Sequence, residues 1–138
     1  MSTEDNAPCP CGSEKALKQC CGPFLSQERL APTAEQLMRS RYSAFALGAA
    51  DYLISTLAPE RRSPNERRML EQELRQTQWV KLEIVDTLAG RATDATGVVE
   101  FNAYFIAPSG AGCLHERSNF RKEGEKWFYV DGQVEVSK

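Results

Sequence analysis

The chain has 138 residues, of which 41% are hydrophobic and 26% charged, and its formal net charge is −2. This length predicts one domain with a small appendage, and the composition provides enough apolar residues for a buried core. The weak, mixed charge argues against direct binding to DNA or to an anionic membrane surface. No apolar run approaches the ~20 residues of a membrane span and no secretory signal is evident, so we expect a cytoplasmic protein.

Four of the five cysteines are clustered near the N-terminus. They are Cys9, Cys11, Cys20 and Cys21, spaced as C-x-C, eight residues, then C-C. In a cytoplasmic chain, clustered thiols more often bind a metal than form disulfides. A tetrahedral set of sulfur ligands suits zinc, and iron is the alternative metal. We therefore predict a tetrathiolate metal site; a disulfide pair and a redox-active thiol pair are the less favoured interpretations.

The segment 1–29 contains little apolar surface of its own. Apart from Met1, its sizeable apolar side chains are Leu17, Phe24 and Leu25. This surface is too small to offset an ordering cost of ~1–2 kcal/mol per residue, whereas a structural zinc ion contributes on the order of 10 kcal/mol. We therefore predict that metal holds this segment together, with a short helix capped by Ser13 and a stop at Gly22-Pro23.

Three helices are expected after the cysteine segment. Thr33-Ala-Glu-Gln36 has the pattern of a capping box and predicts the start of a helix that ends at Gly48. Asp51 is expected to cap a second, shorter helix that ends at Pro59. Ser63-Pro-Asn-Glu66 predicts a capping box, with proline at the first helical position, for a third helix.

Four strands follow, because apolar and polar residues then alternate. They are expected at 80–84, 98–106, 113–122 and 126–136. In the third strand the alternation places Leu114, Glu116, Ser118 and Phe120 on one face and His115 on the other, solvent-facing side. Helices followed by hairpin-connected strands predict an α+β fold, in which three helices pack on a curved four-stranded antiparallel sheet.

A pocket between the helices and the sheet is the second candidate site. If Leu114 and Phe120 mark the concave face, Glu116 and Ser118 point into the pocket, where a carboxylate can act as an acid or base. Partners for Glu116 are expected among Arg39, Arg41, Tyr42 and Tyr104. Asp131, which alternation places with Trp127 and Tyr129, is a second candidate acid. The alternatives are that Glu116 is a structural carboxylate bound to an arginine and that Asp131 caps a turn at Gly132.

The cysteine pattern, with Gly-Ser after Cys11 and lysines before Cys20, resembles the SEC-C motif, the zinc-binding tail of the SecA translocation ATPase. The sequences at 38–45, 114–120 and 127–132 make the whole chain similar to the YchJ-like family of SEC-C proteins. This resemblance implies a metal-binding knuckle at 1–29 and a nuclear transport factor 2-like cone at 30–138. It also implies that the partner of the knuckle belongs to the ribosome, a chaperone or the secretion machinery.

Three functions remain open from the sequence. The favoured one is a metal-binding interaction protein whose knuckle docks on a macromolecular partner. The second is a small enzyme or ligand-binding protein that uses the cone pocket, with Glu116 or Asp131 as acid or base and Ser118, Tyr104 and Arg41 nearby. The third is metal handling or thiol redox sensing. The fold does not choose among them, because one fold hosts many functions.

Overall fold

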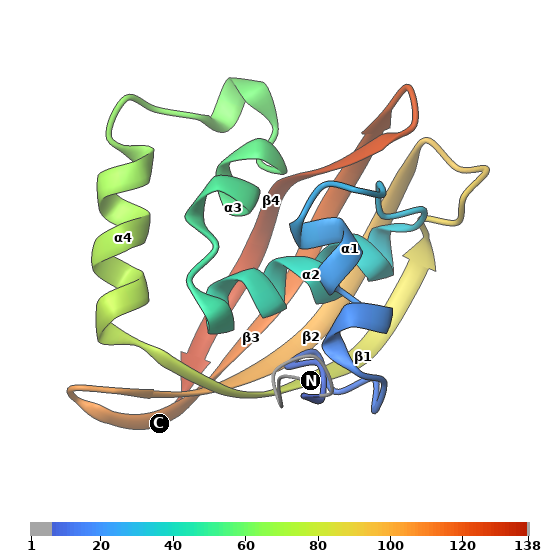
Figure 1. Ribbon diagram of the computed structural model, residues 1–138. Helices are drawn as coiled ribbons and strands as arrows, with labels where there is room; N and C mark the ends of the chain where they lie inside the picture. The colour runs from blue at the N-terminus through green and yellow to red at the C-terminus, as the bar shows by residue number, and fades with distance from the viewer. Residues whose placement is uncertain (1–6, 138) are drawn as a thin grey trace.

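Helices cover one face of an antiparallel sheet in the computed structural model of the protein, which describes residues 7–137 (Figure 1). The helical elements are η2 Leu17–Gln19, α1 Gly22–Leu25, α2 Ala34–Leu47, α3 Ala50–Ser55, η3 Pro59–Arg61 and α4 Glu66–Gln76, where η denotes a 3₁₀ helix. The strands are β1 Gln78–Ala89, β2 Thr96–Ala107, β3 Gly110–Glu123 and β4 Lys126–Ser137. The predicted α+β fold is therefore confirmed; the first six residues of the predicted knuckle lie outside the described residues.

The sheet is a meander in which each strand pairs antiparallel with the next, in the order β1-β2-β3-β4. Its concave face carries the core, as the alternation in β2 predicts: Val99, Phe101 and Ala103 are all buried there. No helix among residues 7–137 is long and apolar enough to cross a membrane. The apolar faces of the helices pack on the concave face of this sheet.

Bulges bend the edge strands and change which residues face the core. In β1 the pairing shifts between Trp79 and Lys81 and again between Ile84 and Asp86. An extra residue in one strand interrupts the alternation and increases the local bend. Simple alternation through the strand expected at 80–84 would place Val80 on the buried face with Leu82, but as the extra residue of the first bulge Val80 is 57% exposed.

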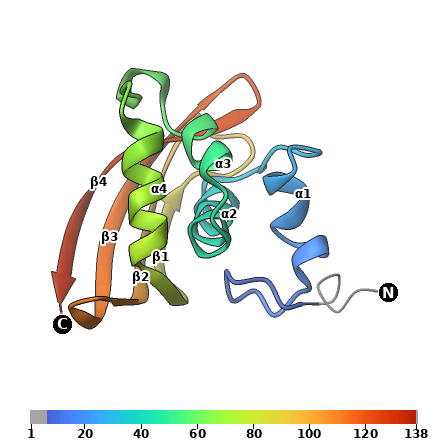
Figure 2. The same cartoon turned by 60° about the vertical axis from the view of Figure 1, so that its left-hand side comes forward.

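Helix α2 is the centre of the molecule. Figure 2 shows the sheet on one side of α2 and the N-terminal cysteine segment on the other, with α3 alongside. As a result even its polar residues Ser40 and Ser43 are fully buried. The Ser40 hydroxyl lies 2.7 Å from the phenol oxygen of Tyr52 in α3. The sheet, the cysteine segment and α3 therefore all contribute to fixing the position of α2.

The termini of α2 follow the sequence prediction. Thr33 is the N-cap, and its Oγ1 accepts a hydrogen bond from the backbone N–H of Gln36 at 3.1 Å. Gly48 ends the helix with a φ of 80°, a left-handed conformation that glycine adopts without steric cost. The capping pattern therefore locates both ends of the helix on which the candidate sites are built.

The predicted caps of the other two helices are wrong. Helix α3 begins one residue before Asp51, whose carboxylate instead pairs with Arg67 of α4. It ends at Ser55, before Pro59, because the chain then runs beside β4: the Ala58 N–H donates to the Tyr129 carbonyl at 2.8 Å. Helix α4 begins at Glu66, and its N-cap Asn65 makes no side-chain capping bond.

Loss of the Thr33 cap should destabilise α2. We expect Thr33→Ala to lower the free energy of unfolding by about 1 kcal/mol, because the Gln36 N–H loses its acceptor. Thr33→Ser keeps the hydroxyl and is the matched control. Urea unfolding monitored by circular dichroism measures both; equal stability of the alanine and serine variants would contradict the assigned cap.

Candidate metal centre and cavity

The four clustered cysteines converge on one point. Their Sγ atoms all lie within 4.8 Å of one another. The Sγ of Cys20 lies 3.7 Å from that of Cys11 and 3.9 Å from that of Cys21. A zinc ion bound tetrahedrally at about 2.3 Å from each sulfur places the sulfurs about 3.8 Å apart. The cluster therefore fits a tetrahedral metal ion, with sulfur at all four positions.

Two turns bring the cysteines together. The first holds Cys9 and Cys11: the Cys9 N–H donates to the Lys15 carbonyl at 2.9 Å, and the Gly12 N–H donates to the Cys9 carbonyl at 3.2 Å. The second follows η2 and holds Cys20 and Cys21, with the latter as N-cap of α1. The chain therefore returns to the same point after one short loop.

Two local predictions for this segment are wrong. Ser13 does not cap a helix, because η2 starts only after Ala16; its hydroxyl instead donates to the Cys20 sulfur at 3.1 Å. Gly22-Pro23 does not end the segment but opens α1, where proline is tolerated because the first helical N–H groups need no partner in the helix. The first correction places the Ser13 hydroxyl at the sulfur cluster.

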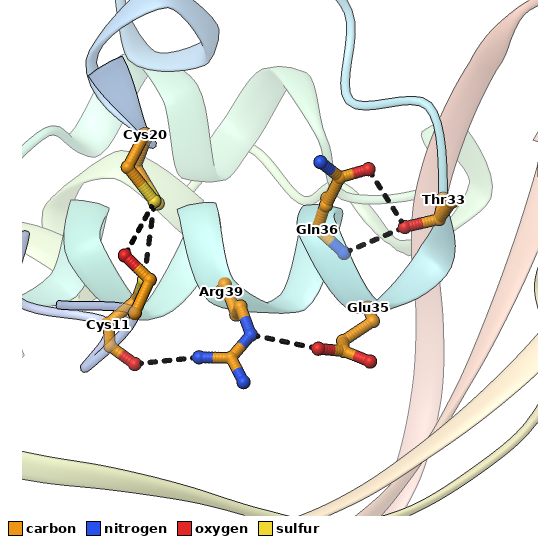
Figure 3. Close-up of polar contacts among 8 residues, drawn as sticks. Cys11, Cys20, Thr33, Glu35, Gln36 and Arg39 are labelled. Atoms are coloured by element: carbon orange, nitrogen blue, oxygen red, sulfur yellow. Dashed lines mark hydrogen bonds and ion pairs between the residues drawn. The ribbon is translucent and has the colours of Figure 1, made fainter. Parts of the chain in front are cut away.

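The cluster is attached to α2. The Arg39 Nη1 of this helix donates to the Cys11 carbonyl at 2.9 Å, and its Nε pairs with Glu35 at 3.0 Å (Figure 3). Arg39 is therefore a partner of the cysteine loop and not of Glu116. The Cys9 sulfur lies 3.4 Å from the Ser43 hydroxyl, and the Cys11 side chain is fully buried. Four thiolates and a divalent ion carry a net charge of −2, which this guanidinium offsets.

Cys20 is the ligand nearest to solvent, since Cys9, Cys11 and Cys21 are buried and Cys20 is only partly so. Even there, burial raises the pKa of the thiol. A bound cation reverses this effect, because metal coordination favours the thiolate. A bound metal ion would therefore stabilise the Cys20 thiolate.

A cavity of about 180 Å³ lies between α2, α4 and the concave face of the sheet. Its lining residues are mostly apolar or aromatic: Met38, Arg41, Tyr42, Phe45, Glu73, Trp79, Phe101, Ala103, Leu114, Glu116 and Tyr129. The polar groups on it are few and come from separate elements. This combination is typical of sites that bind small molecules.

Glu116 lies on the concave face, as the alternation predicts, and is only 8% exposed. Its Oε2 accepts hydrogen bonds from the Ser118 hydroxyl at 2.7 Å and from the Tyr129 phenol at 2.6 Å. Burial and the neighbouring carboxylate both raise the pKa of Tyr129, so the phenol remains a donor. The partners of Glu116 are therefore two hydroxyl groups, and no arginine is paired with it directly.

Arg41 is buried beside this group. Its Nη1 donates to the Leu53 carbonyl at 2.9 Å and to the Thr56 hydroxyl at 2.6 Å. The guanidinium lies over the Tyr129 ring, 4.9 Å from the centroid. Burial lowers the pKa of Arg41 to about 10, which leaves it charged at neutral pH. A fixed positive charge therefore accompanies the Glu116 carboxylate in the cavity wall.

Asp131 does not reach the cavity. The pairing of β3 with β4 shifts at Val130, so that Phe120 faces Tyr129 but Asn119 faces Asp131. The prediction that Asp131 shares a face with Tyr129 is therefore wrong, because a bulge separates the two residues. Asp131 lies within β4 and accepts a hydrogen bond from the Asn119 amide at 2.8 Å, so it does not cap a turn either.

Tyr104 also lies on the convex face. It pairs with Cys113 in the sheet, and its phenol donates to Glu83 at 3.4 Å. His115 is on this face as predicted, 2.9 Å from a Glu100 carboxylate oxygen. Of the predicted pocket residues, Arg41 and Glu116 line the cavity and Ser118 supports Glu116, whereas Tyr104 and Asp131 are remote from it.

Three cavity residues with polar side-chain atoms were not predicted as site residues. Tyr129 could have been found, because it alternates with Trp127 before the bulge at Val130. Trp79 packs against the core and also forms part of the cavity wall. Glu73 enters from α4, and no sequence signal marks it. The position of α4 over the sheet depends on contacts between distant elements, which no local pattern encodes.

Comparisons with known proteins agree with this geometry. Residues 33–132 match the family model described as the YchJ middle NTF2-like domain, and residues 6–23 match the SEC-C motif. A UPF0225 protein of Streptomyces coelicolor is 44% identical over 126 residues, which cover 91% of this chain and 94% of that protein. A UPF0225 protein of Sodalis glossinidius is 43% identical over 129 residues, covering 92% and 83% respectively.

Solved structures show the same arrangement. The solution structure of a SEC-C motif-containing protein from Rhodopseudomonas palustris has a TM-score of 0.83 and 35% identity, and covers 91% of this chain and 97% of that one. A SEC-C motif-containing protein from Psychrobacter arcticus gives a TM-score of 0.77 at 28% identity, covering 99% and 88%. The fold and the cysteine cluster define a SEC-C motif protein with an NTF2-like domain. The chain belongs to the YchJ family, whose members include the UPF0225 proteins.

Removal of one cysteine ligand should cost both metal and stability. We expect Cys21→Ser to lose the bound metal and to lower the melting temperature by about 10 °C or more, because the metal site stabilises the packing on α2. Cys113→Ser, which removes the cysteine outside the cluster, is the matched control. Elemental analysis and thermal unfolding measure the two effects; metal content equal to that of the control would contradict the site.

A side chain at Gly132 should disturb Glu116. A Cβ atom at Gly132 would collide with the Glu116 Oε2. We expect Gly132→Ala to lower the free energy of unfolding by about 1–3 kcal/mol, because the carboxylate must leave its hydroxyl partners. The exposed neighbour Gln133→Ala is the control. If the clash is the cause, adding Glu116→Ala to Gly132→Ala will cost less than the sum of the single effects.

Proposed function

We propose that this protein is a zinc-binding interaction protein of the cytoplasm, whose cysteine knuckle (residues 1–29) docks on a macromolecular partner. The four-sulfur ligand set supports this role, since a catalytic zinc keeps one position open for water or substrate and a structural zinc does not. The domain that follows, residues 30–138, then provides the scaffold. Zinc is favoured over iron because a closed tetrahedral thiolate site suits it.

The observation that carries the proposal is a basic groove beside the cluster. The groove measures about 230 Å³ and is lined by Cys20, by Gln19 and Gln36, and by the cations Lys15, Arg29 and Arg39. The most accessible cysteine of the knuckle thus lies in a groove with three positive side chains. Arg39 is already paired with Glu35, so Lys15 and Arg29 are the cations that can meet a partner. Charge complementarity favours an acidic segment of a partner protein, because interfaces juxtapose opposite potentials.

The resemblance to the SecA tail favours a partner in the secretion machinery, a chaperone or the ribosome. The alternative in which Asp131 acts as an acid or base in the cone pocket is disfavoured, because Asp131 lies on the face of the sheet opposite to Glu116. Metal handling is disfavoured as well, because three of the four cysteines are buried against α2 and exchange would disturb the core.

Charge reversal in the groove should remove the partner without removing the metal. The test variant is Lys15→Glu combined with Arg29→Glu; the control, Arg75→Glu with Lys81→Glu, makes the same charge change on exposed residues outside the groove. Affinity capture from cell extract, followed by mass spectrometry, compares the two. We expect specific proteins to be lost by the groove variant alone, with metal content unchanged. Identical sets of captured proteins in both would contradict the proposal.

A further inference from the structure

We propose that the cavity between α2, α4 and the sheet binds a small apolar amino acid as a zwitterion, with its carboxylate at Arg41 and its ammonium group at Glu116. This site is separate from the metal cluster, and the inference does not depend on the proposed docking function. It is carried by a buried cation without an ion-pair partner, a carboxylate oxygen without a donor and an apolar enclosure of limited volume.

The unpaired cation is the guanidinium of Arg41, which is only 7% exposed. Arginine is almost never fully buried in proteins unless it is paired. Arg41 forms no ion pair with a carboxylate of residues 7–137, and both of its hydrogen bonds leave from Nη1 toward neutral oxygens of Leu53 and Thr56. The opposite edge of the guanidinium, formed by Nε and Nη2, thus has no acceptor within the described chain.

These unpaired N–H groups are open to the cavity. Among the described residues, Trp79 Nε1 is the single side-chain nitrogen or oxygen that both lacks a hydrogen-bond partner and is closed off from any open space. The Nε and Nη2 of Arg41 lack a partner but are not closed off, and the open space that Arg41 lines is the cavity. A carboxylate bound there can accept two parallel hydrogen bonds, the arrangement that arginine commonly forms with carboxylates.

The acceptor for the ammonium group is Glu116. Both of its hydrogen bonds, from Ser118 and Tyr129, end at Oε2, and no donor in residues 7–137 reaches Oε1. By the same reasoning, Oε1 is open to the cavity that Glu116 lines. The carboxylate is thus held in place by one oxygen and can accept a hydrogen bond from a charged N–H group with the other.

Tyr129 sets the distance between the two charges. The Arg41 Cζ lies over its ring, 4.9 Å from the centroid, and the Glu116 Oε2 lies 2.6 Å from its phenol oxygen. With one group over the ring face and the other beyond the ring edge, the two charges are roughly 7 Å apart. In an α-amino acid the nitrogen and the carboxyl carbon are about 2.5 Å apart, and a hydrogen bond adds about 2.9 Å at each end. The molecule is therefore long enough to contact both groups.

The charges of the lining favour a zwitterion over either ion alone. Among the described lining residues, Arg41 is the one cation, while Glu116 and Glu73 are carboxylates. A ligand with only a carboxylate would meet these two anions without a compensating group of its own. A ligand with only an ammonium group would add a second cation and leave Arg41 unpaired. An amino acid pairs with both signs and adds no net charge.

The rest of the enclosure selects an aliphatic side chain of moderate size. Its remaining walls are apolar or aromatic, among them Met38, Phe45 and Phe101. The cavity measures about 180 Å³, and a dry apolar cavity of about 150 Å³ holds benzene. A ligand of about seven to nine non-hydrogen atoms therefore fits, which is the size of valine or leucine and not that of tryptophan.

Leucine and two analogues that each lack one charged group test this inference. 4-Methylpentanoate is leucine without the amine, and isopentylamine is leucine without the carboxylate. We expect titration of the ¹⁵N-labelled full chain with L-leucine to displace the Arg41 Nε–H resonance and the backbone amides of Ala103 and Leu114. The indole resonance of Trp127, which does not line the cavity, should stay in place. Each analogue should bind at least about tenfold more weakly than leucine, because one charge-assisted contact is lost.

A variant of the carboxylate separates recognition from packing. Glu116→Gln retains a carbonyl oxygen for the Ser118 and Tyr129 hydroxyls but no longer presents a negative charge to the ammonium group. We expect it to bind leucine about tenfold more weakly and 4-methylpentanoate more tightly, a reversal of preference that a loss of packing would not produce. The control Glu83→Gln makes the same charge change on the convex face and should bind as the wild type does.

Equal binding of leucine and its two analogues, or an unchanged preference in Glu116→Gln, would overturn the proposal. So would the absence of any displacement of the Arg41 resonance by L-leucine up to about 10 mM, which would leave water as the occupant of the cavity.

Discussion

The packing of the sulfur cluster on α2 is the constraint on which the rest of the structure depends. The loop that carries the cysteines has few apolar residues, and it is fixed by Cys9 beside Ser43 and by Arg39 at the Cys11 carbonyl. Without a metal ion, no cation would link the three buried sulfurs. A small domain that recruits a structural metal can order a segment that its hydrophobic core could not order alone.

The second constraint is the placement of bulges in the sheet. An irregularity of one residue decides which side chains reach the cavity and which reach solvent. At Val130 it turns Asp131 to the convex face and brings Gly132 against Glu116, so that the carboxylate gains space and keeps its two hydroxyl donors. The polar character of the cavity therefore depends on Val130, the extra residue of the bulge, which does not line the cavity.

The sequence was sufficient for the features that local patterns encode. The cysteine spacing located the cluster, Thr33 and Gly48 located the ends of α2, and alternation placed Glu116 on the inner face. It failed where tertiary contacts override local rules: Asp51 pairs with Arg67 of α4 instead of capping its own helix. Bulges leave no mark in a simple alternation, and so Asp131 was assigned to the wrong face.

One turn of α2 contacts both the cysteine cluster and the cavity. Arg39 reaches the cysteine loop, Arg41 lies in the cavity wall over Tyr129, and Ser43 returns to the cluster at Cys9. Successive side chains of a helix point in different directions, so a rotation or shift of this segment moves all three groups at once. The metal centre and the cavity thus both contact the same turn of α2. A displacement of this turn would therefore change contacts of the metal centre and of the cavity together.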